Sequence, residues 1–150
     1  MYTVEEFDKC KTKVFKYITY KKRTENEIRI KFTSIIEEDI LNDIIEYYKN
    51  YGYINDVEYI NKAISEYMKL KNLSIKEVKY KLSLKGINRN LLENYIDKNE
   101  EEMIEYEMSS AIHISDKKLG KFNEQELKMY LAKKGYKGDT IRKVIDTIEK

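Results

Sequence analysis

The chain contains no proline and no tryptophan, and it has only five glycines among its 150 residues. Tight β-hairpin turns and loop-rich folds depend on glycine and proline, so their scarcity argues against a β-sheet protein. Charged residues make up 37% of the chain, a composition that is typical of helices with solvated outer faces. The predicted fold class is all-α.

Cysteine and histidine each occur once, as Cys10 and His113. A single cysteine excludes a disulfide within the chain, and neither residue has the neighbours that a zinc site requires. Cys10 lies at helical spacing from apolar residues and is predicted to be a small core residue. His113, which lies between two isoleucines, is expected at the surface or half-buried.

Phosphate-binding and metalloprotease motifs are also missing, as is a nucleophile with a histidine to activate it. We therefore expect no catalytic residues, no bound metal and no cofactor. No apolar run reaches the roughly 20 residues that span a bilayer, and the first residues are too polar for a signal peptide. These absences predict a cytoplasmic protein with no membrane contact.

A short phrase occurs three times along the chain at nearly equal spacing. Each copy has Ser, Thr or Asn, then Glu three places later, apolar residues at the fourth and eighth places and a basic residue at the fifth. The copies are Thr24, Glu27, Ile28, Arg29 and Phe32; Ser74, Glu77, Val78, Lys79 and Leu82; and Asn123, Glu126, Leu127, Lys128 and Leu131. The polar pair forms a capping box, and the apolar pair shares one face of a helix. Each phrase therefore predicts the start of an amphipathic helix.

Apolar residues at helical spacing also precede and follow each phrase, which predicts three tandem three-helix repeats at residues 1–56, 57–99 and 100–150. Units of this size bury little surface alone, so we expect them to stack into an elongated array. The first capped helix is predicted to run from Ile28 to Ile36. Asn55 or Asp56 is expected to cap the next repeat, and the polar stretch 115–121 indicates a loop.

The net charge is only +2, but it is distributed unevenly. Residues 1–56 carry 10 basic and 11 acidic side chains, residues 57–99 carry 9 and 5, and residues 100–150 carry 10 and 11. A basic middle repeat favours a patch that meets an acidic or nucleoprotein surface, and it argues against coating of DNA driven by charge alone.

Several segments resemble one known family. Residues 23–29, which read RTENEIR, are similar to its R-T-x-x-E-L-R phrase, and residues 52–59, which read GYINDVEY, are similar to its G-Y-[IL]-[ND]-D-x-x-[YF] phrase. Residues 85–87 and 134–136 match its recurring turn of lysine, glycine and a hydrophobic residue. The chain thus resembles RecX, the family of proteins that regulate the RecA recombinase.

One departure from the family pattern lies in the first repeat. The chain reads Ile35, Ile36, Glu37 where the family has lysine followed by glycine. Glycine takes the left-handed conformation that ends a helix, whereas glutamate takes it at a cost of roughly 1 kcal/mol or more. We expect the chain to turn differently at this point.

The resemblance implies a protein that is not an enzyme and that consists of three three-helix repeats. It implies binding along the groove of the RecA filament on DNA, with lower ATPase, strand-exchange and coprotease activities of that filament. The implied partners are RecA and, weakly or through the filament, DNA. The chain is expected to be a monomer.

The basic residues on and after the capped helices are the candidate contacts for such a partner. Arg29, Lys79 and Lys128 recur at the same place beside the core stripe, where their charge can point outward. The full predicted basic track comprises Arg23, Arg29, Lys31, Lys79, Lys81, Lys85, Arg89, Lys128, Lys133 and Lys134. Lysine is abundant throughout the chain, so a chance arrangement is the alternative for any single member.

Two other functions are compatible with the pattern. Three-helix units can present a recognition helix to a DNA groove, which would make the protein a direct DNA-binding helical repeat protein. The near-neutral first and third repeats argue against that function. A structural scaffold for another helical partner is the third possibility, and it would tolerate alanine at Arg29, Lys79 and Lys128.

Overall fold

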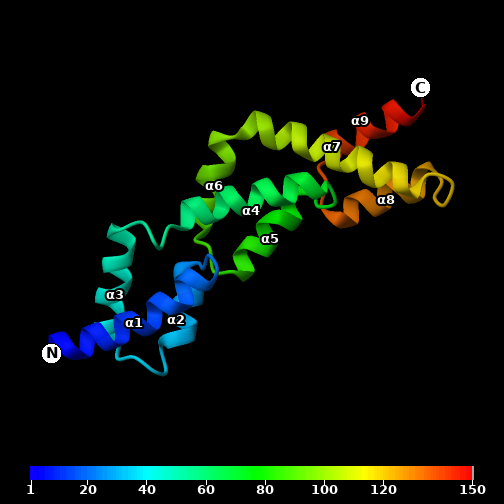
Figure 1. Cartoon of the computed structure of the whole chain (residues 1–150). Helices are drawn as coiled ribbons and strands as arrows, with labels where there is room; N and C mark the ends of the chain where they lie inside the picture. The colour runs from blue at the N-terminus through cyan, green and yellow to red at the C-terminus, as the bar shows by residue number, and fades with distance from the viewer. Residues whose placement is uncertain (150) are drawn as a thin grey trace.

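The computed structural model describes residues 1–149, and over this range every regular element is an α-helix (Figure 1). The all-α prediction is confirmed. The described helices are α1 (Val4–Tyr20), α2 (Glu25–Phe32), α3 (Glu38–Asn50), α4 (Asp56–Leu70), α5 (Ile75–Leu84), α6 (Arg89–Lys98), α7 (Glu100–Lys118), α8 (Glu124–Lys134) and α9 (Gly138–Glu149).

The three repeated phrases all form the expected capping boxes and begin α2, α5 and α8. At the first, the Thr24 hydroxyl accepts a hydrogen bond from the Glu27 amide at 3.1 Å, and the Glu27 carboxylate accepts one from the Thr24 amide at 3.0 Å. The Asn55 side chain caps α4, which was one of the two predicted alternatives.

Buried apolar side chains form three clusters along the described chain. The first draws its buried residues from α1, α2, α3 and the turns that follow α2 and α3. The second uses α4, α5, α6 and the first part of α7, and the third uses the rest of α7 with α8 and α9. Helix α7 therefore serves two clusters, whereas no helix is shared between the first and the second. The repeat boundaries at residues 56 and 99 remain a prediction.

The capped helices follow one another in a row along the molecule in the order α8, α5, α2 (Figure 1). The C-terminal turn of α8 meets the N-terminus of α5, and the C-terminal turn of α5 meets the N-terminus of α2. The termini of the described chain lie at opposite ends of an elongated molecule, as Figure 1 shows. We call this arrangement the capped-helix row.

Two local predictions need correction. The first capped helix spans Glu25–Phe32 and ends earlier than Ile36, because residues 33–36 form turns. The predicted loop at 115–121 is partly helix, since α7 continues to Lys118. Ser115 is fully buried there, because its small side chain allows close packing although it is polar. The polar composition of this part of the stretch therefore did not indicate a loop.

The altered turn of the first repeat follows the prediction. No residue between Phe32 and Glu37 has a positive φ, and Glu37 instead becomes the N-cap of α3 with φ −59°. Cys10 and His113 are both half-buried, and Cys10 packs against the first cluster.

Candidate functional site

The predicted basic track lies on or beside the capped-helix row, but its members have different surroundings. The fifth residue after each cap is bound to an acidic side chain of its own repeat. Arg29 Nε lies 3.1 Å from Glu25 Oε2, Lys79 Nζ lies 3.2 Å from Glu93 Oε1, and Lys128 Nζ lies 3.1 Å from Glu124 Oε1. These three cations are therefore partly neutralised.

Two of these side chains also bridge helices of one repeat. Arg29 donates from Nη1 to Asn42 Oδ1 at 2.7 Å, which links α2 to α3. The pair between Lys79 and Glu93 links α5 to α6 in the same manner. In the first two repeats the residue at this position thus stabilises the repeat, and any contact that it makes with a partner remains a prediction.

Lys85 and Lys134 lie where successive capped helices meet. At the first joint, between α5 and α2, the Thr24 hydroxyl donates to the Lys85 carbonyl at 2.7 Å, and Lys85 Nζ lies 3.8 Å from Glu27 Oε2. The hydroxyl thereby accepts a hydrogen bond from its own helix and donates one to the carbonyl of the residue that caps the end of the neighbouring helix. Both end groups would otherwise lack a partner.

The second joint, between α8 and α5, repeats this arrangement. The Ser74 hydroxyl donates to the Lys134 carbonyl at 2.7 Å, and Lys134 Nζ lies 3.3 Å from Glu77 Oε2. Thr24 and Ser74 are both fully buried. The third cap, Asn123, is exposed and meets no helix end in the described part of the chain.

Glycine is required at these joints for two reasons. Gly86 and Gly135 have φ values of +77° and +97°, a conformation in which other residues are strained. A Cβ added at Gly86 would lie 2.2 Å from the Asn26 side chain, and one at Gly135 would lie 2.9 Å from the Lys76 side chain. The turn of lysine and glycine is thus the element against which the preceding capped helix packs. The turn of the first repeat receives no preceding capped helix in the described chain, so it does not need this glycine.

The remaining members of the track have no acidic partner among the described residues. Arg23 stacks over the Tyr17 ring at 3.9 Å and donates from Nε to the Tyr17 carbonyl at 3.4 Å. Lys31 lies 5.8 Å from the same ring. The members without an ion pair to any described residue are Arg23, Lys31, Lys81, Arg89 and Lys133.

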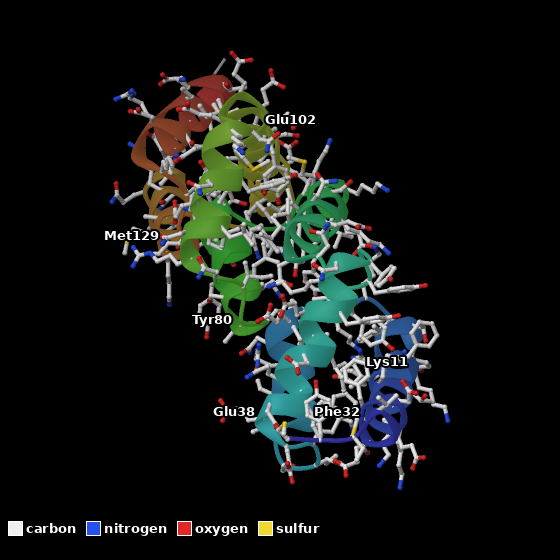
Figure 2. All side chains as sticks on the ribbon, turned by 90° about the vertical axis from the view of Figure 1, so that its left-hand side faces the viewer. Lys11, Phe32, Glu38, Tyr80, Glu102 and Met129 are labelled. Carbon is white, nitrogen blue, oxygen red and sulfur yellow. The ribbon has the colours of Figure 1, made fainter. Side chains whose placement is uncertain are left out.

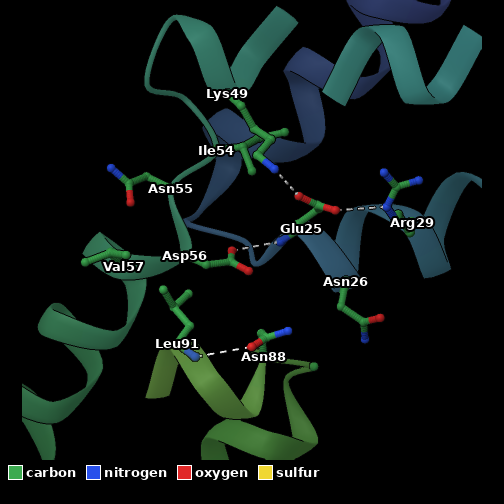
Figure 3. A pocket seen from close by; sticks show the side chains of 11 residues that line it. Glu25, Asn26, Arg29, Lys49, Ile54, Asn55, Asp56, Val57, Asn88 and Leu91 are labelled. Carbon is green, nitrogen blue, oxygen red and sulfur yellow. Dashed lines mark hydrogen bonds and ion pairs between the residues drawn. The ribbon is translucent and has the colours of Figure 1, made fainter. Parts of the chain in front are cut away.

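A groove of about 560 Å³ opens at the first joint, and Glu25 lies in it (Figure 3). Its carboxylate contacts Arg29 and also Lys49 Nζ, the latter at 2.8 Å, and its amide donates to Asp56 Oδ1 at 3.0 Å. Burial opposes ionisation of Glu25, but hydrogen bonds from Lys49 and Arg29 outweigh it and lower its pKa. Burial raises the pKa of Asp56. The groove is therefore lined by charges that already neutralise one another.

The second joint carries a buried polar group of a different kind. Glu107 on α7 is almost fully buried, burial raises its pKa, and its Oε1 has no hydrogen-bond partner within residues 1–149. Beside it, Ser110 donates to the Leu73 carbonyl at 2.8 Å and lies 2.6 Å from the Tyr136 hydroxyl. The Tyr106 hydroxyl donates to the same carbonyl at 2.7 Å. The first joint has no equivalent of this network among the described residues.

Over residues 1–149, no helix combines the length and the apolar character needed to cross a bilayer. The described side chains also include no group of three or more that could bind a metal ion together. The second role of Thr24 and Ser74, as donors across the joints, was not predicted from the sequence. One sequence feature could have indicated this role: the first two caps carry a hydroxyl, whereas the third cap carries a side-chain amide.

No protein-family model matches the chain. The regulatory protein RecX of Clostridium botulinum strain Eklund 17B is 28% identical over 147 residues, which cover 91% of this chain and 67% of that protein. The regulatory protein RecX of Finegoldia magna is 30% identical over 139 residues, covering 85% and 66% of the two chains.

Solved structures with the same fold were also found. The crystal structure of RecX from Lactobacillus salivarius superposes with a TM-score of 0.85 and covers 98% of this chain and 99% of that chain, at 22% identity. A second crystal structure, of a regulatory protein RecX, has a TM-score of 0.77 and covers 94% of this chain and 73% of that chain, at 20% identity. At these identities the likeness shows the fold.

Proposed function

Because this chain belongs to the RecX family of regulatory proteins, we propose that it binds the RecA recombinase filament on DNA and lowers the ATPase, strand-exchange and coprotease activities of that filament. The protein would act by binding, without a chemical step of its own. Its role would lie in the regulation of recombination, DNA repair and the SOS response.

The capped-helix row is the observation that carries this proposal. Three helices with the same cap and the same buried face are joined end to end by two similar joints, so the molecule presents a similar surface three times. A partner made of repeated subunits can bind such a surface at several points, and weak contacts then add through effective concentration. A recombinase filament is a partner of this kind.

The basic track remains a proposed part of the contact, and the structure divides it into two sets. Lys31, Lys81 and Lys133 have no acidic partner among the described residues, whereas Arg29, Lys79 and Lys128 are each paired. An unpaired cation can meet an acidic side chain or a phosphate without first losing an internal ion pair. We therefore propose that the unpaired set contributes more to binding.

The test is to titrate the protein into a preformed RecA filament on single-stranded DNA and to measure ATP hydrolysis. We expect inhibition at or below one molecule per recombinase subunit, and binding that is tighter to the filament than to RecA or DNA alone and that weakens with salt. Absence of inhibition by folded protein with a cognate recombinase would contradict the proposal. Equally tight binding to bare DNA would favour the direct DNA-binding function instead.

Two triple variants test the division of the track. Alanine at Lys31, Lys81 and Lys133 and alanine at Arg29, Lys79 and Lys128 change the net charge equally, so long-range attraction is matched. We expect the first variant to need several times more protein for half-inhibition than the second. Equal losses would mean that general charge, and not local contact, determines binding.

A further inference from the structure

Each capped helix exposes a large apolar side chain at the sixth residue after its cap. Ile30 is 72% exposed, Tyr80 is 64% exposed and Met129 is 64% exposed. The fourth and eighth residues of the same helices are buried in the three clusters. A residue two places from each of them lies about 200° around the helix, so these side chains point away from the cores.

The middle helix extends this surface by one turn. Leu84 follows Tyr80 by four residues, lies on the same helix face and is 66% exposed. The Tyr80 side chain makes no hydrogen bond or ring contact with the described residues. Figure 2 shows Tyr80 and Met129 at the same edge of the molecule. We call Ile30, Tyr80, Leu84 and Met129 the apolar ridge.

Single exposed apolar residues are normal on any protein surface and need no explanation. Here, however, the same position of three helices in one row is apolar and exposed, although the three residue types differ. Exposure of apolar side chains to water is unfavourable, and a partner that covers them removes this cost. The repetition therefore points to a partner that covers the same position of each repeat.

Spacing and charge describe that partner. Successive ridge residues are separated by about a dozen helical residues and one joint, or roughly 20 Å along the row at 1.5 Å per residue. Lys31 and Lys81 follow Ile30 and Tyr80 directly, Lys133 lies one turn after Met129, and none of the three has an ion pair with a described residue. Each apolar contact is thus bordered by an available positive charge, which complements a pocket with an acidic rim.

We propose that the apolar ridge contacts the protein part of the filament, and that Ile30, Tyr80 and Met129 enter equivalent apolar pockets with acidic rims on different recombinase subunits. This assignment rests on the proposed function. It gives the contact with protein to the ridge and to the three lysines that border it, and leaves any contact with DNA to the other members of the basic track. Tyrosine is frequent among the residues that dominate protein interfaces, so Tyr80 is the expected centre of the contact.

The first experiment compares two matched triple variants in the filament ATPase assay. Glutamine preserves helix propensity and net charge, so Ile30, Tyr80 and Met129 are replaced by glutamine in one variant. In the control, glutamine replaces three exposed apolar residues at helix ends outside the row, which are Tyr20, Leu70 and Leu119. Circular dichroism and thermal unfolding establish that both variants are folded.

We expect the ridge variant to need about tenfold or more protein for half-inhibition, as loss of a main interface contact would produce, with the control within twofold of wild type. The salt dependence of binding should stay unchanged, because no charge is removed. A folded ridge variant that inhibits like wild type overturns the ridge assignment alone. A wild-type protein that fails to bind the filament overturns the proposed function and the ridge together.

Photo-crosslinking identifies what the ridge touches. With benzoylphenylalanine in place of Tyr80, we expect a covalent product with the recombinase, and a product with DNA alone would overturn the assignment. With the same group at both Ile30 and Met129, one chain should be linked to two recombinase subunits. Products that contain one subunit only would overturn the part of the proposal that distributes the ridge over several subunits.

Discussion

The two joints of the molecule share one design but differ in what surrounds them. Both use a buried hydroxyl, a helix-ending glycine and a lysine that pairs with the glutamate of a capping box. At the second joint, α7 also belongs to the cores on both sides, and a buried network surrounds the Leu73 carbonyl. At the first joint none of the described helices is shared, and a charged groove opens beside the contact.

The direction of two joined helices and the stiffness of their joint therefore depend on different contacts. The hydroxyl and glycine contacts align the helix ends equally at both joints. The additional apolar area and the network on α7 stabilise only the second, since each buried apolar group and each satisfied buried hydrogen bond adds to stability. We therefore expect the middle and C-terminal clusters to behave as one unit and the N-terminal cluster to change its angle more readily.

The largest effect is expected for Gly86→Ala at the first joint. The positive φ costs about 1 to 2 kcal/mol with alanine, and the clash with Asn26 forces the helix ends apart at a further cost of about 1 to 3 kcal/mol. Gly52→Ala is the matched control, because its φ is also positive at +78° but no atom of the described residues lies within 4 Å of an added Cβ.

Denaturant unfolding and small-angle scattering measure the two consequences. Gly86→Ala should lower the free energy of unfolding more than Gly52→Ala and should also change the overall dimensions of the molecule. Equal losses and unchanged dimensions would show that the first joint tolerates separation and does not align the clusters.

The second effect concerns the hydroxyls. Thr24→Ala and Ser74→Ala each remove a cap, which costs about 1 kcal/mol, and a hydrogen bond to a carbonyl, which costs about 1 kcal/mol more. Asn123→Ala removes a cap only. We expect losses of about 2 kcal/mol for the first two variants and about 1 kcal/mol for the third, measured by urea unfolding. A loss for Asn123→Ala as large as the other two would mean that the hydroxyl contributes nothing across the joint.

These joints also show how far the sequence alone leads. Capping boxes and apolar spacing depend on residues three or four places apart, so the all-α class and the helix starts could be predicted from Thr24, Ser74 and Asn123. The contact between Thr24 and Lys85 joins residues that are distant in the chain, and no local pattern contains it. Arg29 and Lys128 pair with glutamates four places earlier in their own helices, a spacing that the sequence shows, but the ion pair between Lys79 and Glu93 crosses between helices. The sequence could therefore identify a basic track but not all of its neutralised members.

Acidity should affect the second joint through Glu107. Its raised pKa means that the folded protein retains a proton that the unfolded chain loses near pH 4.5, so wild-type stability falls as the pH rises above that value. Glu107→Gln removes this loss, because a neutral amide is less costly to bury than a carboxylate. We expect the variant to gain on the order of 1 kcal/mol at pH 7 and little at pH 4.

Glu25→Gln at the first joint provides the opposite case. The pKa of Glu25 is lowered, so its contribution to stability is present above pH 4.5 and is lost as the pH falls through the folded pKa. This variant should be less stable than wild type at neutral pH and should approach it in acid. Thermal unfolding from pH 3 to pH 8 compares the two variants, and parallel pH profiles would contradict the assigned environments of both carboxylates.

The smallest effects are expected for the two lysines of the joints. The Lys134 side chain is 20% exposed and its ion pair spans 3.3 Å, whereas the Lys85 side chain is 45% exposed and its pair spans 3.8 Å. Methionine keeps the apolar stem and removes the charge, so Lys134→Met should cost up to about 1 kcal/mol and Lys85→Met about 0.5 kcal/mol or less. Lys133→Met is the control without an ion pair to a described residue. If Lys134→Met is no more costly than Lys133→Met, or if 1 M salt does not reduce its cost, the ion pair adds nothing, and the extra stability of the second joint comes from α7 alone.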